Sequence, residues 1–163
     1  MFDKELMAKA EEILSIGRDR HLRIAAAESC TGGLIAALLT EIPGSSSVIG
    51  RSFVTYSNRA KREVLGVDAD VLKQHGAVSE PVVCAMAQNT FDMTTAHLTV
   101  AVSGIAGPGG GSDEKPVGTV HMATATKDSV IHQCCRFGDI GRTNVRLATV
   151  HAAADMLLAR LKD

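Results

Sequence analysis

Apolar residues recur at helical spacing near both ends of the chain. Between residues 3 and 20 they fall three or four positions apart, which predicts the buried face of an amphipathic helix: Leu6, Ala10, Ile13, Leu14 and Gly17. A second stripe predicts a closing helix and consists of Leu147, Val150, Ala154, Leu157, Leu158 and Leu161. A shorter segment of helix-forming residues, 34–39, ends before Pro43 and Gly44.

Capping residues predict three further helices in the middle of the chain. Ser57 or Asn58 can cap a short helix through residues 61–65, and Asp68 can cap another. Ser79, with Pro81 in the first turn, opens a longer helix of about 15 residues.

Five runs of apolar and β-branched residues predict strands, at residues 22–27, 48–56, 97–103, 117–126 and 130–137. The last two runs are separated only by a short turn, so we expect them to form an antiparallel hairpin. Strands flanked by helices predict an α/β fold, a three-layer α/β/α sandwich whose sheet is mixed but mostly parallel. Because no repeat, linker or composition break divides the sequence, we expect a single domain over residues 1–163.

The composition excludes several classes of protein. Lys and Arg total 17 against 18 for Asp and Glu, a net charge of −1, which argues against binding nucleic acid by counterion release. Only 3% of the residues are aromatic, so stacking of single-stranded bases is not expected either. No apolar stretch approaches the roughly 20 residues of a membrane span, and the charged residues 1–5 do not begin a signal peptide. We therefore expect a cytoplasmic protein without a nucleic-acid or membrane partner.

The cysteines and histidines form no metal-binding pattern. The four cysteines are Cys30, Cys84, Cys134 and Cys135, and they include no Cys-x-x-Cys pair. The adjacent pair would point to opposite faces of a strand, and we expect the last three to be small buried residues in a reducing compartment. Three strands can bring His97, His121 and His132 together, but in the absence of a His-x-x-x-His pair we predict no metal.

The first candidate site is the turn between the strand at 22–27 and the helix at 34–39. It reads Glu28-Ser29-Cys30-Thr31-Gly32-Gly33. Ligands gather at the carboxyl ends of parallel strands, where free N–H groups of a helix N-terminus can stabilise an oxyanion. Ser29 is a candidate nucleophile there, although Ser29 or Thr31 can equally serve as a cap. Cys30 is the rival nucleophile, because a helix N-terminus favours a thiolate.

The second candidate site is the glycine-rich segment 104–111, which also follows a strand. Gly104, Gly107 and Gly109 are among its five glycines, so the backbone can approach a ligand closely or form an anion nest. The segment matches neither a P-loop nor the dinucleotide fingerprint. A mobile surface loop is the alternative interpretation.

Two basic positions complete the candidate chemistry. If the charges of Arg59 and Arg62 lie close to Lys61, they favour the neutral amine that a base requires, and Tyr56 can face the same rim. The alternative for Lys61 is a solvated basic helix face. Arg142 and Arg146 share a face at the start of the closing helix, as a phosphate clamp or as a surface pair.

Taken together, these segments resemble the nicotinamide-nucleotide amidase family, the C-terminal domain of the competence/damage-inducible protein CinA. The resemblance rests on the segments Ala27-Glu28-Ser29-Cys30-Thr31-Gly32-Gly33, Pro43-Gly44-Ser45-Ser46, Thr55-Tyr56-Ser57-Asn58 with Lys61, Leu65-Gly66-Val67, Gly76-Ala77-Val78-Ser79-Glu80, Gly104-Ile105-Ala106-Gly107-Pro108 and Lys115-Pro116-Val117-Gly118-Thr119-Val120. They span most of the chain in the order of the family. Many members carry a separate pyrophosphatase-like domain, for which 163 residues leave no room, so we expect a stand-alone amidase.

The resemblance implies hydrolysis of nicotinamide mononucleotide to nicotinate mononucleotide and ammonia in pyridine-nucleotide salvage, without a metal or cofactor. It implies Ser29 as nucleophile, with Lys61 and Tyr56 as its basic and hydrogen-bonding partners. We expect the substrate to be contacted by Glu28, Cys30, Thr31, Gly32, Gly33, Gly104, Gly107, Gly109 and Arg142. Members of the family often place Gly-Asp-Arg before the last helix, whereas here Gly141 directly precedes Arg142.

Two other functions stay open at this point. One is a non-catalytic or weakly catalytic nucleotide-binding module linked to competence or DNA damage, and the other is a thiol hydrolase that uses Cys30. The resemblance and the apolar content also lead us to expect a homodimer whose partner is a small-molecule substrate.

Overall fold

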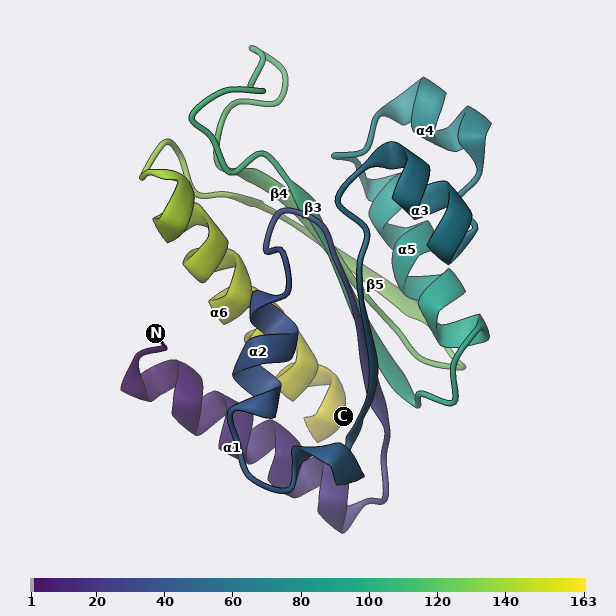
Figure 1. Cartoon of the computed structure of the whole chain (residues 1–163), viewed down its shortest axis with the longest axis vertical. Coiled ribbons are helices and arrows are strands. Elements are labelled where there is room, and N and C mark those ends of the chain that lie inside the picture. Colours follow the sequence, from purple (N-terminus) through teal and green to yellow (C-terminus); the bar gives the residue numbers. More distant parts are fainter. Residues whose placement is uncertain (1) are drawn as a thin grey trace.

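A five-stranded sheet runs between two layers of helices in the computed structural model, which describes residues 2–163 (Figure 1). The strands of that part of the chain are β1 (Ile24–Glu28), β2 (Ile49–Val54), β3 (Leu98–Gly104), β4 (Thr119–Ala125) and β5 (Val130–Arg136). Its α-helices are α1 (Lys4–Asp19), α2 (Leu34–Thr40), α3 (Asn58–Leu65), α4 (Ala69–His75), α5 (Glu80–Asp92) and α6 (Arg142–Lys162).

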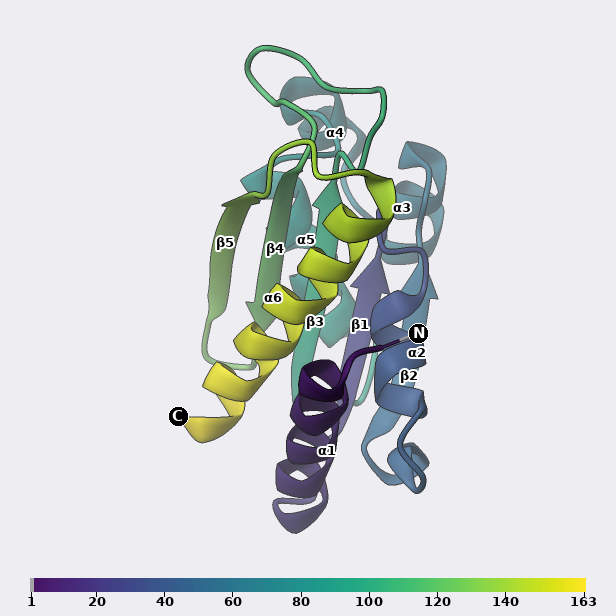
Figure 2. The ribbon, with the colours of Figure 1, turned by 90° about the vertical axis from the view of Figure 1, so that its left-hand side faces the viewer.

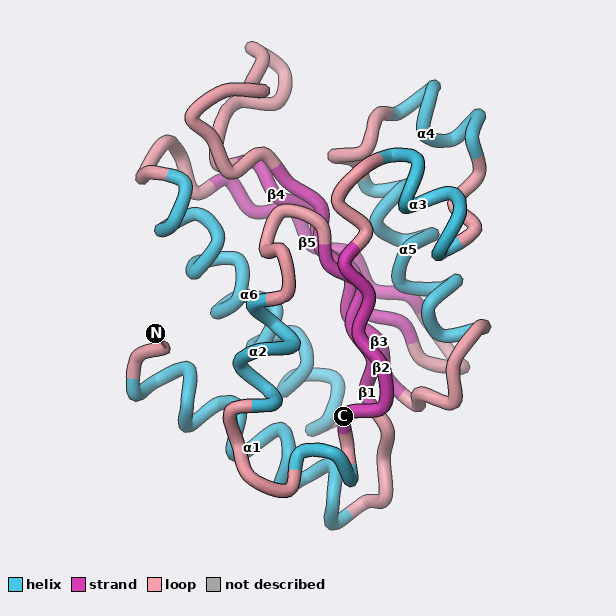
Figure 3. The backbone as a smooth tube through the Cα atoms, in the orientation of Figure 1, coloured by secondary structure: helices cyan, strands magenta, loops and turns pink. Residues whose placement is uncertain are grey.

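The sheet is mixed, with strand order β2-β1-β3-β4-β5. β1 pairs in parallel with β2 and β3, whereas β4 is antiparallel to both of its neighbours, so that β4 alone runs against the other strands. Helices α1, α2 and α6 cover one face, and α3, α4 and α5 cover the other (Figures 1 and 3). The predicted three-layer α/β/α fold with a mixed, mostly parallel sheet is confirmed.

The two terminal helices pack on the same face of the sheet, the one turned to the viewer in Figure 2. All five predicted positions of α1 are buried. Gly17 lets α1 pack closely against Val48. A Cβ at this position would lie only 2.6 Å from Val48 Cγ1. In α6 the predicted stripe is shifted at its start: Val145 and Thr149 are buried, and Leu147 is half-buried.

Small side chains on the opposite face allow α5 to lie close to the sheet. Ala27, Ala101 and Ala123 are neighbours in register across β1, β3 and β4, and each is fully buried. They share one apolar cluster with Val83 and Met86 of α5. Because both faces are covered, β1 and β3 are buried along nearly their whole length, as expected for central strands of such a sheet.

The predicted caps are mostly present. Ser57 accepts a hydrogen bond from the Ala60 N–H, and Asp68 accepts from two N–H groups of α4. Ser79 does occupy the position before α5, but its hydroxyl donates to the Gly76 carbonyl instead of accepting from the helix. Its contribution is therefore to the preceding turn.

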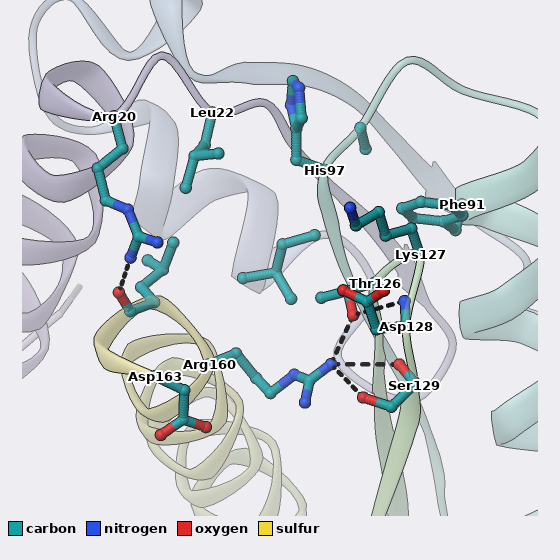
Figure 4. Close-up of a pocket in the computed structure, with 13 residues that line it drawn as sticks. Arg20, Leu22, Phe91, His97, Thr126, Lys127, Asp128, Ser129, Arg160 and Asp163 are labelled. Carbon is teal, nitrogen blue, oxygen red and sulfur yellow. Dashed lines mark hydrogen bonds between the residues drawn. The ribbon is translucent and has the colours of Figure 1, made fainter.

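Because β1, β2 and β3 run in parallel, their carboxyl ends lie together at one end of the sheet. The opposite end holds a pocket of about 500 Å³ between α1, α6 and the β4–β5 turn (Figure 4). There Arg160 donates to Thr126 Oγ1 at 2.8 Å and to both oxygens of Ser129, which ties the end of α6 to the turn. No helix within residues 2–163 is long and apolar enough to cross a membrane.

The strand histidines lie apart, and the cysteines expected to be buried are more accessible, since Cys84 and Cys135 are half-buried. His97 accepts from the Arg23 N–H at the start of β3, whereas His121 pairs in register with Ser103 near the other end, so the three strand histidines do not meet. Cys134 is exposed, not buried, because β5 is an edge strand whose side chains are largely exposed. The adjacent cysteines do face opposite sides, since Cys135 packs against the cluster beneath α1 and α6.

Candidate active site

A buried lysine contacts the predicted nucleophile at the carboxyl ends of the parallel strands. Lys61 lies in α3 with only 1% of its surface exposed, and its Nζ donates to Ser29 Oγ at 2.8 Å and to the Thr55 carbonyl at 2.7 Å. Ser29 directly follows β1, and Thr55 directly follows β2. Side chains that are far apart in the sequence are thus brought together by the parallel pairing of two strands and the helix that follows the second.

Burial lowers the pKa of Lys61 to about 8. Removal from water disfavours the ammonium form, and no carboxylate bonds the amine to offset that cost. The predicted repulsion by neighbouring arginines is not the cause, since the Arg59 guanidinium points outward and pairs with Glu63 at 2.7 Å. The alternative of a solvated basic face is wrong for Lys61 because its side chain is buried.

Glu28 shapes the turn that carries Ser29. Its fully buried carboxylate accepts from the Thr31 hydroxyl at 2.6 Å and from the N–H groups of Gly33, Ile35 and Ala36 at 2.9 to 3.1 Å. A negative charge at a helix N-terminus is favourable, and four donors compensate its burial. Glu28 and Thr31 are therefore committed to the start of α2, and neither lines the cavity described below.

Arg146 of α6 holds the same turn from the other side. Its guanidinium donates to the Cys30 carbonyl at 3.1 Å and to the Thr31 carbonyl at 2.8 Å. Because the Cys30 carbonyl and the Thr31 N–H belong to one planar peptide unit, this contact also fixes the direction of that N–H. Gly32, with φ near 60°, lies against the same guanidinium.

Two N–H groups of the turn, within residues 2–163, donate to no oxygen. The Ser29 N–H bonds the Val102 carbonyl, the Gly32 N–H bonds the Ser29 carbonyl and the Gly33 N–H bonds Glu28. The N–H groups of Cys30 and Thr31 have only the Cys30 sulfur, a weak acceptor, beside them. These two donors, next to the Ser29 hydroxyl, form a candidate oxyanion hole.

Arg142, one helical turn before Arg146, connects two segments at the rim of the site. It donates to the Gly107 carbonyl at 2.8 Å and to the Tyr56 hydroxyl at 2.6 Å. Tyr56 is 58% exposed and lies just past the end of β2. The glycine-rich loop is thus tied to the start of α6 and to the end of β2.

These elements surround a cavity of about 200 Å³. It is lined by Ser29, Cys30, Tyr56, Lys61, Ala77, Val78, Ser103, Gly104, Ala106 and Arg142. Gly104 must be a glycine because a Cβ there would lie 2.5 Å from a methyl group of Val120. Two other glycines were expected to contact the substrate. The Gly107 carbonyl accepts a hydrogen bond from Arg142, and a Cβ at Gly109 would have no other atom within 4 Å.

Four lining residues were missed by the sequence reasoning: Ala77, Val78, Ser103 and Ala106. Ser103 is buried and donates to the Ala77 carbonyl at 2.7 Å, so the two segments close the wall together. The position of Ser103 at the carboxyl end of a parallel strand was the one available signal.

Comparison with known proteins shows the family of the chain. Residues 6–161 match the family model described as the CinA C-terminal domain. The chain belongs to this family. A crystal structure of the competence/damage inducible protein CihA from Agrobacterium tumefaciens superimposes with a TM-score of 0.97, at 50% identity, over 100% of this chain and 99% of that one.

Relatives of this CinA-family chain differ in length. The nicotinamide-nucleotide amidohydrolase PncC of Escherichia coli K12 is 47% identical over 154 residues, which are 93% of each chain. A CinA-like protein of Parasynechococcus marenigrum is 46% identical over 153 residues, but the match spans only 36% of its length.

The capping of α2 by Glu28 yields a prediction on stability. We expect Glu28→Gln to lower the free energy of unfolding by about 2 kcal/mol, since it removes a charged acceptor of several hydrogen bonds. Urea unfolding followed by circular dichroism measures the change. The matched control is Glu41→Gln at the exposed end of the same helix, expected to change stability by less than about 0.5 kcal/mol. Equal effects of the two substitutions would contradict the capping role.

Proposed function

We propose that the protein hydrolyses the carboxamide of nicotinamide mononucleotide to nicotinate mononucleotide and ammonia, with Ser29 as nucleophile and Lys61 as its base. The observation that carries the proposal is the 2.8 Å contact between Lys61 Nζ and Ser29 Oγ. By relationship to the amidohydrolase of E. coli, which it matches over 93% of both chains, this chain is an amidase. The identity of its amide and its place in pyridine-nucleotide salvage are the proposed part.

Lys61 has the two properties that a base for Ser29 needs. With its pKa near 8, a useful fraction of the amine is neutral at physiological pH. The neutral amine keeps one N–H on the Thr55 carbonyl, 2.7 Å away, and turns its lone pair to the Ser29 hydroxyl. The Tyr56 hydroxyl accepts from Arg142, whereas Ser29 Oγ accepts from Lys61, so we assign the base to Lys61 and place Tyr56 at the rim of the substrate cavity.

The reaction then proceeds in two steps. Ser29 Oγ attacks the carboxamide carbon while its proton moves to Lys61, and the oxyanion is held by the N–H groups of Cys30 and Thr31. One such donor contributes about 3 kcal/mol to the transition state. The intermediate expels ammonia, which takes its proton from Lys61, and leaves an acyl ester on Ser29. Water, activated by the same amine, hydrolyses the ester to the carboxylate.

The remainder of the nucleotide extends past the rim. The N-terminus of α6 and the guanidinium of Arg142 supply free N–H groups and positive charge at the cavity mouth, as a phosphate requires. Gly104 and the loop after it let the backbone approach the ligand closely.

The competing functions are less well supported. Burial raises the pKa of the Cys30 thiol to about 11, so this group keeps its proton near neutral pH and is a poor nucleophile. A non-catalytic nucleotide-binding module would not need a buried lysine against a serine hydroxyl, an arrangement that costs desolvation energy. The homodimer and the cytoplasmic location stay predictions.

Replacement of the nucleophile tests the proposal. We expect Ser29→Ala to reduce ammonia release from nicotinamide mononucleotide by at least about a thousandfold, because no acyl ester can form. Cys30→Ala, in the adjacent residue, is the matched control and should keep most of the activity. Loss of activity in the cysteine variant alone would transfer the nucleophile to Cys30, and no release by folded wild type would favour the binding module.

The pH dependence of the reaction reports on the base. Because the neutral amine is the active form, we expect kcat/KM to rise about tenfold per pH unit at low pH and to level off above about pH 8. The measurement is the initial rate at low substrate between about pH 6 and pH 10. A rate that keeps rising towards the ordinary lysine pKa of 10.5 would contradict burial as the means of activation.

The support of the oxyanion hole by Arg146 can be tested separately. We expect Arg146→Met to lower kcat about tenfold or more with a smaller change in KM, because the Thr31 N–H loses its fixed direction. Arg146→Lys should recover part of the loss. Arg160→Met removes the hydrogen bonds at the far end of the same helix and should leave kcat unchanged (Figure 4). A parallel fall of kcat in both methionine variants would point to destabilisation of α6 instead.

A further inference from the structure

A chain of titratable side chains crosses the outer part of the sheet, away from the Lys61–Ser29 site. Cys134 Sγ of β5 lies 3.7 Å from His121 Nε2 of β4, and His121 Nδ1 lies 2.9 Å from His132 Nε2. His132 Nδ1 in turn faces a carboxylate oxygen of Glu80, at the start of α5, at 3.5 Å. The two imidazole rings are nearly parallel, with an interplanar angle of 20° and centroids 5.1 Å apart.

The carboxylate of Glu80 lies at one end of this series of side chains and determines which nitrogen of each imidazole carries the proton. Glu80 accepts, so His132 carries its proton on Nδ1 and presents Nε2 as an acceptor. His121 must then donate from Nδ1, which leaves its Nε2 unprotonated and turned to the thiol of Cys134. Burial, and next the neighbouring His132, lower the pKa of His121, which keeps this imidazole neutral at pH 7.

The same groups border an open cavity. Cys134 is exposed and lines a cavity of about 590 Å³ together with His121 and Glu80. Thr119, also in its lining, has only 2% of its surface exposed, and its hydroxyl has no hydrogen-bond partner within residues 2–163. This residue therefore places an unpaired buried hydroxyl in the wall of the cavity. The remaining charged or titratable groups of the lining are His75, Glu114, Lys115 and Arg136.

We propose that Cys134 is a reactive thiol, activated by the chain His121–His132–Glu80, that exchanges with small disulfides entering this cavity. His121 Nε2 takes the thiol proton, and the Cys134 thiolate attacks one sulfur of the disulfide. A new sulfur–sulfur bond joins Cys134 to that sulfur as the old one breaks. The other half leaves as a thiolate and takes up the proton, so that Cys134 is oxidised and the departing sulfur is reduced. The proposal does not depend on the amidase activity.

The second cysteine of β5, which is half-buried, offers an internal control. Cys135 is adjacent in sequence but packs on the opposite face of the sheet, away from the two imidazoles. We expect brief treatment with dipyridyl disulfide at about pH 7, followed by peptide mass mapping, to label Cys134 at least about tenfold faster than Cys135.

Variants separate activation from mere exposure. His121→Gln should slow labelling of Cys134 about tenfold at pH 7, because the thiol loses its proton acceptor. Glu80→Gln, at a side chain that is 64% exposed and tolerant of substitution, should slow labelling in the same direction. Thermal unfolding confirms that each variant is folded. Equal labelling of the two cysteines at pH 7, or a rate unchanged by Glu80→Gln and by folded His121→Gln, would overturn the proposal.

Discussion

The burial of the Lys61 amine determines which hydrogen-bond partners the surrounding structure has to supply. Lys61 is enclosed so completely that its ammonium form is disfavoured, yet its nitrogen needs hydrogen-bond partners, and these are the Ser29 hydroxyl and the Thr55 carbonyl. Both partners sit at the ends of parallel strands, so the order and direction of β1 and β2 are requirements of the site. The proposed role of Lys61 as a base near neutral pH rests on the cost of desolvating its ammonium form.

The second constraint is the shape of the turn after β1. The proposed oxyanion hole needs the Cys30 and Thr31 N–H groups beside Ser29. Glu28 takes up the donors that start α2, while Arg146 anchors the carbonyls from α6. A negative and a positive side chain thus hold the two sides of one turn, and each is contributed by a different layer of the fold.

Local patterns were sufficient to predict the fold but only part of the site. Some features depend only on residues close in sequence, and the spacing of apolar residues and the glycines predict them directly. They are the apolar stripe of α1, the hairpin of β4 and β5, and the turn at Ser29. Lys61 is different, because two flanking arginines suggested a solvated face, and only the packing of α3 on the strand ends buries it. The contribution of Ser103 to the cavity wall is likewise tertiary, because its partner Ala77 is distant in the sequence. The exposure of Cys134 follows from an edge position that periodicity does not reveal.

The most direct test of this account is a titration of the Lys61 side chain itself. Selective labelling of lysine and NMR observation of the ε-methylene and amine signals, with Lys61→Met to assign the resonance, would give its pKa in the folded protein. We expect a midpoint of about 8, well below the ordinary lysine pKa of 10.5. A midpoint at the ordinary value would mean that Lys61 stays charged at neutral pH and does not activate Ser29.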